Sequence, residues 1–159
     1  MKELEIKVHL NPIWRDKADF IIRAKCGDVN QGYFWEQLWA RQLGENRFML
    51  CCIPFFAYDL SLGDEVETTT GQEMEYVISR VVKRSCHYTF RVWFENLDNA
   101  EIRNKAFEVL KGLGCLIECH SDKLVGVSID SETLAQQVSG YLLERENAGD
   151  LSYETGRTK

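Results

Sequence analysis

The stretch Ile53–Asp64 reads IPFFAYDLSLGD and separates two parts of the chain that differ in character. It combines dense apolar residues, a proline and a Gly63-Asp64 pair that is typical of a turn. The residues around it predict strands almost throughout, whereas the chain after residue 84 alternates strands with helices. We interpret Ile53–Asp64 as a structural crossover that leaves a buried strand. It contains no His, no Cys and no paired acids, which argues against catalysis at this point.

The N-terminal part, residues 1–84, reads as a series of strands. Apolar residues alternate with polar ones in Leu4–Leu10, which predicts a strand with its apolar side on a core and His9 on the solvent side. Further strands are predicted at 18–25, 33–43, 47–53, 65–70 and 75–83, with turns at 26–28, 44–46 and 70–72. Short strands joined by short turns predict a small bent β-sheet or a partial barrel.

The C-terminal part, residues 85–159, has the order strand, helix, strand, strand, helix, strand. Strands are predicted at 88–95, 115–119, 125–129 and 151–154. The first helix carries an apolar stripe from Ile102 to Leu113, and the second is capped by Asp130 or Ser131 and ends at 147–149. This order is the βαββαβ pattern of a ferredoxin-like fold, with both helices on one face of the sheet. The predicted fold class is therefore α+β, with the two halves forming one compact unit.

Composition and charge narrow the classes of function. The chain has 159 residues, of which 45% are hydrophobic, and this is sufficient for a globular core. A formal charge of −6 disfavours binding to a nucleic-acid backbone and favours a basic protein partner. The dense apolar run Phe48–Ala57 is too short to cross a bilayer, and the N-terminus lacks the apolar core of a secretory signal. We expect a cytoplasmic protein with six reduced cysteines, no membrane association and no cofactor.

Four motifs together resemble a bacterial family that is known as domain of unknown function 4265. They are Leu38-Trp39-Ala40 with Leu43-Gly44, Ile53–Ala57 with Ser61–Asp64, Arg84–His87, and Leu113-Gly114-Cys115. The resemblance runs from about Trp35 to Tyr153. The family favours Ser-Gly-His where this chain has Ser85-Cys86-His87. The resemblance implies no catalytic residues.

Three groups of residues invite a chemical role and have a structural alternative. Ser85 and His87 could act as nucleophile and base, but no orienting acid or oxyanion site can be assigned, so a hydrogen-bonded pair at a strand edge is favoured. Metal ligation by Cys115, Cys119 and His120, or a disulfide between Cys51 and Cys52, is disfavoured because neighbouring strand residues point to opposite faces. The tryptophans at 14, 35, 39 and 93 could stack on bases, but ordinary core packing is favoured.

Acidic residues supply the candidate binding site. They gather at Asp64, Glu65, Glu67, Glu73 and Glu75, and again at Glu132 and Glu144. Such runs are often solvated faces, but here we interpret them as a docking surface for a basic partner. The first hypothesis is a non-enzymatic protein-binding module, namely an immunity protein that neutralises a cognate toxin. The alternatives are a regulatory domain with a small-molecule pocket between the two halves, and a hydrolase built around Ser85 and His87.

Overall fold

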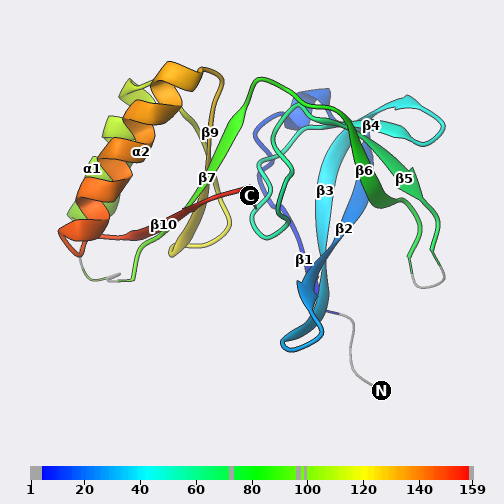
Figure 1. The fold of residues 1–159 in the computed structure, drawn as a ribbon, viewed down its shortest axis with the longest axis horizontal. Coiled ribbons are helices and arrows are strands. Elements are labelled where there is room, and N and C mark those ends of the chain that lie inside the picture. The colour runs from blue at the N-terminus through cyan, green and yellow to red at the C-terminus, as the bar shows by residue number, and fades with distance from the viewer. Residues whose placement is uncertain (1–4, 72–73, 96–97, 99, 158–159) are drawn as a thin grey trace.

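The computed structural model describes residues 5–71, 74–95, 98 and 100–157, and it has two halves, each built on one β-sheet (Figure 1). The sheet of the N-terminal half contains β1 (Ile6–Lys7), β2 (Phe20–Asp28), β3 (Gly32–Gly44), β4 (Arg47–Leu50), β5 (Glu65–Thr69) and β6 (Val77–Lys83). A short 3-10 helix, η1 (Arg15–Lys17), precedes β2. The C-terminal half contains β7 (Tyr88–Trp93), α1 (Ala100–Gly112), β8 (Leu116–Cys119), β9 (Leu124–Ile129), α2 (Glu132–Asn147) and β10 (Ser152–Thr155).

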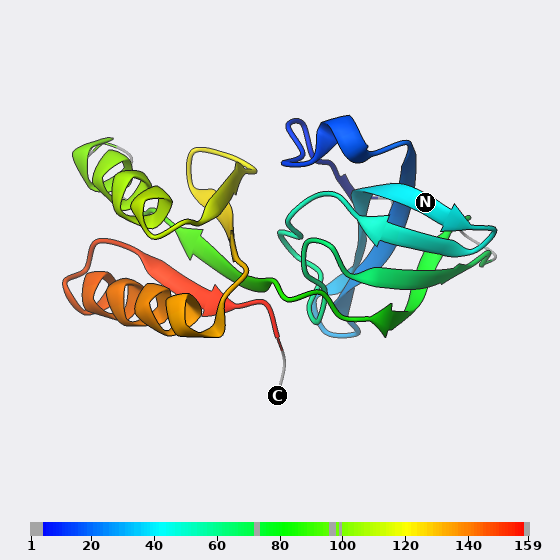
Figure 2. The ribbon, with the colours of Figure 1, turned by 90° about the horizontal axis from the view of Figure 1, so that it is seen from above.

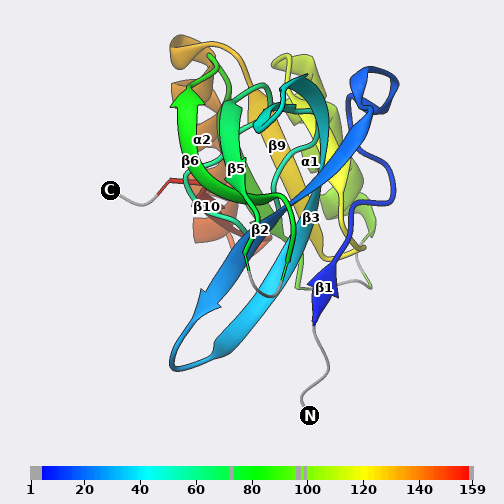
Figure 3. The ribbon, with the colours of Figure 1, turned by 90° about the vertical axis from the view of Figure 1, so that its right-hand side faces the viewer.

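The N-terminal sheet curls into a partial barrel. Its strand order is β1-β3-β2-β6-β5-β4, and β4 also pairs with β3, which brings the sheet back onto itself. Among the described residues, β2 and β6 are joined by one register pair, Arg23 with Val77, so the ring is weakest there. Alternation along β2 directs Ile22, Ala24 and Cys26 into the barrel core. Figure 3 shows β2 and β3 running together as a long hairpin that projects beyond the barrel.

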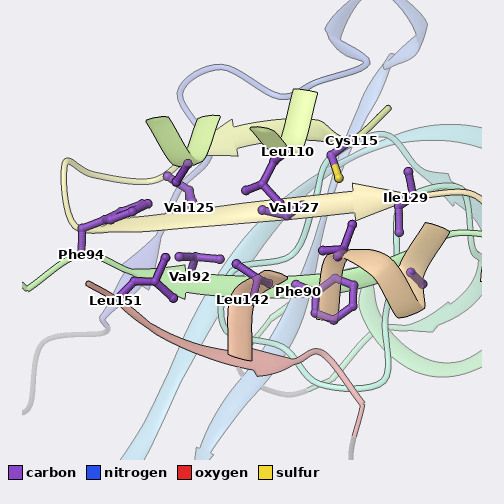
Figure 4. Packing of buried hydrophobic residues seen from close by; sticks show 13 residues of the cluster. Phe90, Val92, Phe94, Leu110, Cys115, Val125, Val127, Ile129, Leu142 and Leu151 are labelled. Atoms are coloured by element: carbon purple, nitrogen blue, oxygen red, sulfur yellow. The ribbon is translucent and has the colours of Figure 1, made fainter. Parts of the chain in front are cut away.

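The C-terminal half has ferredoxin-like topology. The strand order is β10-β7-β9-β8, and all three pairings are antiparallel. Both α1 and α2 cover the face of this sheet that points away from the barrel (Figure 2). Leu110 and Leu142 from the helices pack against Val92, Val125 and Val127 from the strands (Figure 4). The α+β class and the strand and helix order predicted for this half are confirmed.

The crossover segment, Ile53–Asp64, lies between the barrel and the ferredoxin-like sheet. Ala57 and Leu60 belong to the barrel core. On the opposite side Ile53 approaches β9 so closely that a Cβ atom at Gly126 would lie 2.7 Å from Cγ2 of Ile53. The absence of a side chain at Gly126 is thus required for the contact. The crossover segment therefore covers sheet surface that the two helices leave uncovered.

The first predicted strand differs most from the structure. Within the part of Leu4–Leu10 that the structure describes, β1 covers Ile6–Lys7 and pairs in parallel with β3, and Leu4 lies outside the described residues. Val8 and Leu10 are 41% and 72% exposed, whereas His9 is 3% exposed. The predicted facing is therefore reversed, because two buried carboxylates draw the imidazole inward.

Two further strand ends differ from the prediction by three residues. Residues 26–28, expected to turn, extend β2 to Asp28, since they continue its antiparallel pairing with β3. The strand expected at 47–53 ends at Leu50, and Cys51–Ile53 continue as fully buried irregular backbone. The buried character of this stretch was predicted correctly, but its cause is the packing of the crossover segment between the two halves.

Candidate functional site

Glu36 in β3 anchors the crossover segment through its backbone. The side chain is fully buried, and its carboxylate accepts N–H groups from Phe55 at 2.7 Å, Phe56 at 3.0 Å and Ala57 at 2.8 Å. These donors lie in irregular backbone, where a buried N–H group needs an acceptor from outside a strand ladder. Burial alone would raise the pKa of Glu36, but His9 and these N–H groups lower it below its usual value.

His9 lies between two carboxylates and is excluded from solvent. Its Nε2 is 2.7 Å from Oε2 of Glu36, and its Nδ1 contacts Oε2 of Glu118. The imidazole stacks on Phe55, with 4.2 Å between ring centroids and 10° between ring planes. Burial opposes protonation of His9, but Cys52 and the two carboxylates outweigh it and raise the pKa well above its ordinary value of 6.5. The geometry is therefore that of an imidazolium that donates from both nitrogens.

Glu118 in β8 connects the C-terminal half to this cluster. Its side chain is buried, and Oε1 accepts N–H groups from Ile13 and Ile53, each at 3.0 Å. We call His9, Glu36 and Glu118 the histidine clamp. Each of its four carboxylate oxygens accepts at least one hydrogen bond from the protein. The histidine clamp therefore ties β3, β8, the N-terminal segment and the crossover segment together, which favours a structural role over acid–base chemistry.

Arg91 in β7 makes a second charged connection to the crossover segment. It is 1% exposed, its Nη2 contacts the carbonyl oxygen of Ala57, and its Nε donates to the carbonyl oxygen of Pro54 at 3.4 Å. Its Nη1 lies 3.4 Å from Oε1 of Glu154 in β10. The Tyr58 ring covers the guanidinium at 4.6 Å, and its hydroxyl donates to Glu154 at 2.8 Å. Burial and the Glu154 carboxylate raise the pKa of Tyr58.

A cleft of about 520 Å³ opens beside Arg91, where the two halves meet. Three parts of the chain border it: the β2–β3 hairpin, the crossover segment, and strands β7 and β10. We call it the interface cleft. Its lining combines aromatic and charged side chains, among them Lys25, Asp28, Phe34, Phe56, Tyr58, Arg91, Trp93 and Glu154. The small-molecule hypothesis expected a pocket in this region.

A second hollow, of about 380 Å³, lies between α1 and α2, and we call it the helix groove. Its floor is apolar and is formed by Ile102, Ala106, Val109, Tyr141 and Leu151. Its rim is charged and is formed by Glu101, Lys105, Glu144, Arg145 and Asp150. Arg145 and Asp150 form an ion pair at 3.2 Å and offset one another. Glu101 and Glu144 are exposed, so the rim offers carboxylates above an apolar floor.

Asp64 is not accessible to a partner. It is 1% exposed, and its carboxylate accepts the N–H groups of Ser61 at 2.9 Å and Ser85 at 2.8 Å. Arg84 lies 3.7 Å from the same carboxylate. Asp64 therefore fixes the end of the crossover segment against the β6–β7 connection. This corrects the expectation that Asp64 begins an acidic docking surface.

The other predicted acidic residues are divided between the two halves. Glu65 is half-buried, Glu75 is exposed, and Glu73 lies outside the described residues. Glu67 lies 3.0 Å from Arg80 and 3.9 Å from Arg47, so its charge is locally balanced. Glu132 and Glu144 are exposed on α2 in the other half. Of the predicted set, Glu144 borders the helix groove, and Glu65 borders a smaller hollow of about 330 Å³ that Trp14 and Met49 also line.

Ser85 and His87 are engaged with other groups. Ser85 Oγ donates to the carbonyl oxygen of Leu62 at 2.6 Å and accepts the backbone N–H of His87 at 3.2 Å. The His87 imidazole instead pairs through Nδ1 with Ser128 Oγ at 2.9 Å. Burial lowers the pKa of His87. Ser85 and His87 thus lie together in the β6–β7 connection. The Ser85 hydroxyl and the His87 imidazole bond to other groups, so they do not form the hydroxyl–imidazole pair of a hydrolase.

The cysteines are not joined by disulfide bonds. All six lie within the described residues and are free thiols. Cys115 is buried and Cys119 is exposed, whereas His120 packs against Phe55 with 5.0 Å between centroids. Burial raises the pKa of both Cys51 and Cys115 to about 11. Across residues 5–71, 74–95, 98 and 100–157, no group of three or more His, Cys, Asp or Glu side chains is placed to hold a metal ion.

The main polar residues of the interface were not predicted as a site. Glu36, Arg91 and Glu118 each follow an apolar residue in a strand, and a period-two pattern assigns such residues to solvent. His9 was assigned to solvent for the same reason. These side chains lie on the sheet faces that the two halves of the chain turn toward one another, so they are buried between the halves. One signal was present: strands with charged residues adjoin a long apolar stretch that must be buried between them.

The family of the chain follows from the comparison with known proteins. The model of the family described as domain of unknown function (DUF4265) matches residues 36–153, which include Glu36, Arg91, Glu118 and the crossover segment. The chain belongs to this family. The resemblance predicted from the four motifs is therefore confirmed. In this DUF4265 protein the matched region extends from the anchor of the crossover segment to β10.

A solved structure shares the fold of the DUF4265 protein. It is a crystal structure of a hypothetical protein from Neisseria gonorrhoeae, with 20% sequence identity and a TM-score of 0.72. The similarity covers 86% of this chain and 93% of the other, so it includes both halves. No curated protein was found to match the chain. Within the described part of the chain, neither helix has the length and apolar character needed to span a membrane.

Proposed function

We propose that this DUF4265 protein is a non-enzymatic protein-binding module that acts in the cytoplasm as an immunity protein for a basic toxin. The observation that carries the proposal is the helix groove. Its apolar floor can bury a side chain of the partner, while Glu101 and Glu144 at the rim can pair with flanking Lys or Arg residues. The formal charge of −6 adds long-range attraction toward a basic partner.

The positions of the charged residues favour the helix groove as the docking surface. They disfavour the acidic run that begins at Asp64. In that run Asp64 is buried and Glu67 is paired with two arginines. Glu144 is exposed, and Glu132 is exposed at the first residue of α2. We therefore place the docking surface on the helical face of the C-terminal half, which points away from the barrel (Figure 2).

The test begins with a pull-down from the native host, in which mass spectrometry identifies the bound proteins. We expect a positively charged toxin among them. Association of that toxin with wild-type protein is then measured at low and moderate salt, and a co-expression assay measures neutralisation. The Glu101→Lys/Glu144→Lys variant should associate about tenfold more slowly or worse, with a weaker salt dependence, because two attractive charges become repulsive.

The matched control is Glu45→Lys, a charge reversal at an exposed residue in the β3–β4 turn, far from the helix groove. It should retain most of the wild-type association rate. Unchanged kinetics in the double variant, or a captured partner whose activity the protein does not inhibit, would contradict the proposal. Far-UV circular dichroism of each variant verifies that the exposed substitutions preserve the fold.

A further inference from the structure

The interface cleft has the size and composition of a small-ligand site. Its volume of about 520 Å³ lies within the range of roughly 300–1,000 Å³ that such sites occupy. It forms where two parts of one chain meet, which is a common location for ligand sites. The cleft is spatially separate from the helix groove, which lies on the opposite, helix-covered side of the ferredoxin-like sheet.

Arg91 supplies a buried cation on the wall of the interface cleft. A guanidinium has five N–H donors in a planar fork. The hydrogen bonds described for Arg91 use one N–H on each of its three nitrogens, toward Pro54, Ala57 and Glu154. The guanidinium is 1% exposed and lies under the Tyr58 ring, so Arg91 acts on the cleft through its charge, and the exposed Lys25 ammonium supplies donors that a carboxylate can reach.

The charges that line the interface cleft are balanced. Lys25 and Arg91 are cationic, and Asp28 and Glu154 are anionic. Oδ1 of Asp28 accepts the N–H groups of Asn30 and Gln31, both at 2.8 Å, which fixes the carboxylate at the tip of the β2–β3 hairpin. A ligand with a single charge would meet as many repulsive groups as attractive ones. A zwitterion can satisfy both signs.

Aromatic side chains form the remaining wall. Phe34 and Phe56 meet edge to face at 5.6 Å between centroids, and both are half-buried. Trp93 is also half-buried and lines the same cleft. Partly exposed aromatic side chains in the same cleft as charged groups favour a planar apolar group on the ligand.

We infer that the interface cleft binds a free aromatic α-amino acid, with its carboxylate at Lys25 and attracted by the buried charge of Arg91, its ammonium at Asp28 or Glu154, and its ring against Phe34, Phe56 and Trp93. This ligand combines two opposite charges with a planar ring. It also fits the volume of the cleft. The inference does not depend on a protein partner at the helix groove.

Isothermal titration calorimetry of the full-length protein tests the inference with L-phenylalanine, L-tyrosine and L-tryptophan as probes. At least one should bind. Two analogues of L-phenylalanine separate the charges: 3-phenylpropanoate lacks the ammonium and phenethylamine lacks the carboxylate. Each should bind about tenfold more weakly or worse, because a hydrogen bond to a charged group is lost. Binding of none of the amino acids, or an analogue that binds as tightly as L-phenylalanine, would refute the inference.

Two variants test whether the ligand binds in the interface cleft. Lys25→Ala removes an exposed cation and Trp93→Leu removes part of the aromatic wall, and each should weaken binding about threefold or more. Both avoid Arg91, whose contacts also maintain the fold. The control Lys111→Ala, on the exposed end of α1, should leave the affinity unchanged. If Lys25→Ala and Trp93→Leu also bind like wild type, the ligand does not occupy this cleft.

Discussion

At the scale of single residues, His9 shows how a buried charge can be accommodated. An unpaired charge in a protein interior is costly, and removing one member of a buried pair typically costs about 3–5 kcal/mol. Here the imidazolium faces two carboxylates, and those carboxylates also accept backbone N–H groups. Each charge is therefore compensated locally, and His9→Ala would leave two carboxylates facing one another across a cavity.

The first prediction concerns the pH dependence of this contribution. Because the pKa of folded His9 lies above its ordinary value of 6.5, the stabilisation is complete below about pH 6.5 and is lost as the pH rises through the folded pKa. His9→Ala should lower the free energy of unfolding by about 3 kcal/mol at pH 6, and by less at pH 9. Urea denaturation of both proteins across this range measures the difference.

His87 provides a control of opposite sign. Burial lowers its folded pKa, so titration of His87 opposes folding at low pH, and this penalty disappears as the pH rises through 6.5. The stability difference between wild type and His87→Ala should therefore become more favourable to wild type with increasing pH. A His9→Ala difference that stays constant or grows toward pH 9 would show that His9 is not held as an imidazolium.

At the scale of elements, local signals were sufficient for the C-terminal half. Ser131 accepts the N–H of Leu134 and caps α2, as the sequence predicts, and Gly114, with φ of 96°, follows the end of α1. The apolar stripes of the helices and the alternation along the strands identified the topology. Alternate side chains of each strand point either into the core beneath the helices or to the other face of the sheet. The β2–β3 hairpin was also predictable in its main part, although not its extension to Asp28.

The sequence did not indicate the packing of the crossover segment, because that packing depends on contacts distant in the chain. Glu36 and Glu118 are 82 residues apart in the sequence, yet both accept hydrogen bonds from the crossover segment. Patterns of period two report whether a strand has two different faces, but not whether the polar face meets solvent or another part of the protein. For the same reason the acidic run at Asp64 was read as exposed.

The second prediction tests the contact between β9 and the crossover segment. Gly126→Ala places a methyl group 2.7 Å from Ile53 and should destabilise the protein by about 1–3 kcal/mol through overpacking. Gly140→Ala is the control, because that glycine lies within α2 with no atom within 4 Å of the added Cβ. It should stabilise the protein by about 0.5–1 kcal/mol. Chemical denaturation measures both changes, and a neutral Gly126→Ala would rule out the close packing.

At the scale of the whole molecule, charged side chains connect the two halves at two places. The histidine clamp connects β3 to β8, and Arg91 connects β7 to the crossover segment. Separation of the halves would expose these groups without their partners. We therefore expect the halves to unfold together, since neither connection survives without both halves.

The third prediction uses two probes that report different halves. Trp14, Trp35 and Trp39 lie in the N-terminal half, so tryptophan fluorescence reports mainly that half, whereas far-UV circular dichroism at 222 nm reports α1 and α2. The two urea unfolding curves should coincide. Glu118→Ala should shift both midpoints equally, even though Glu118 belongs to β8. Separate midpoints, or a shift in circular dichroism alone, would show that the halves unfold independently.

The position of His9 also bears on how the chain folds during synthesis. The two residues joined by the Nδ1 contact, His9 and Glu118, are 109 positions apart. A ribosome must therefore translate most of the chain before His9 can obtain Glu118 as its partner. Because the two halves are expected to fold as one unit, the N-terminal half leaves the ribosome with an incomplete charge arrangement around Glu36. Synthesis of β8 supplies Glu118 and completes the charge arrangement, so the N-terminal half obtains its full stabilisation late, from a strand of the other half.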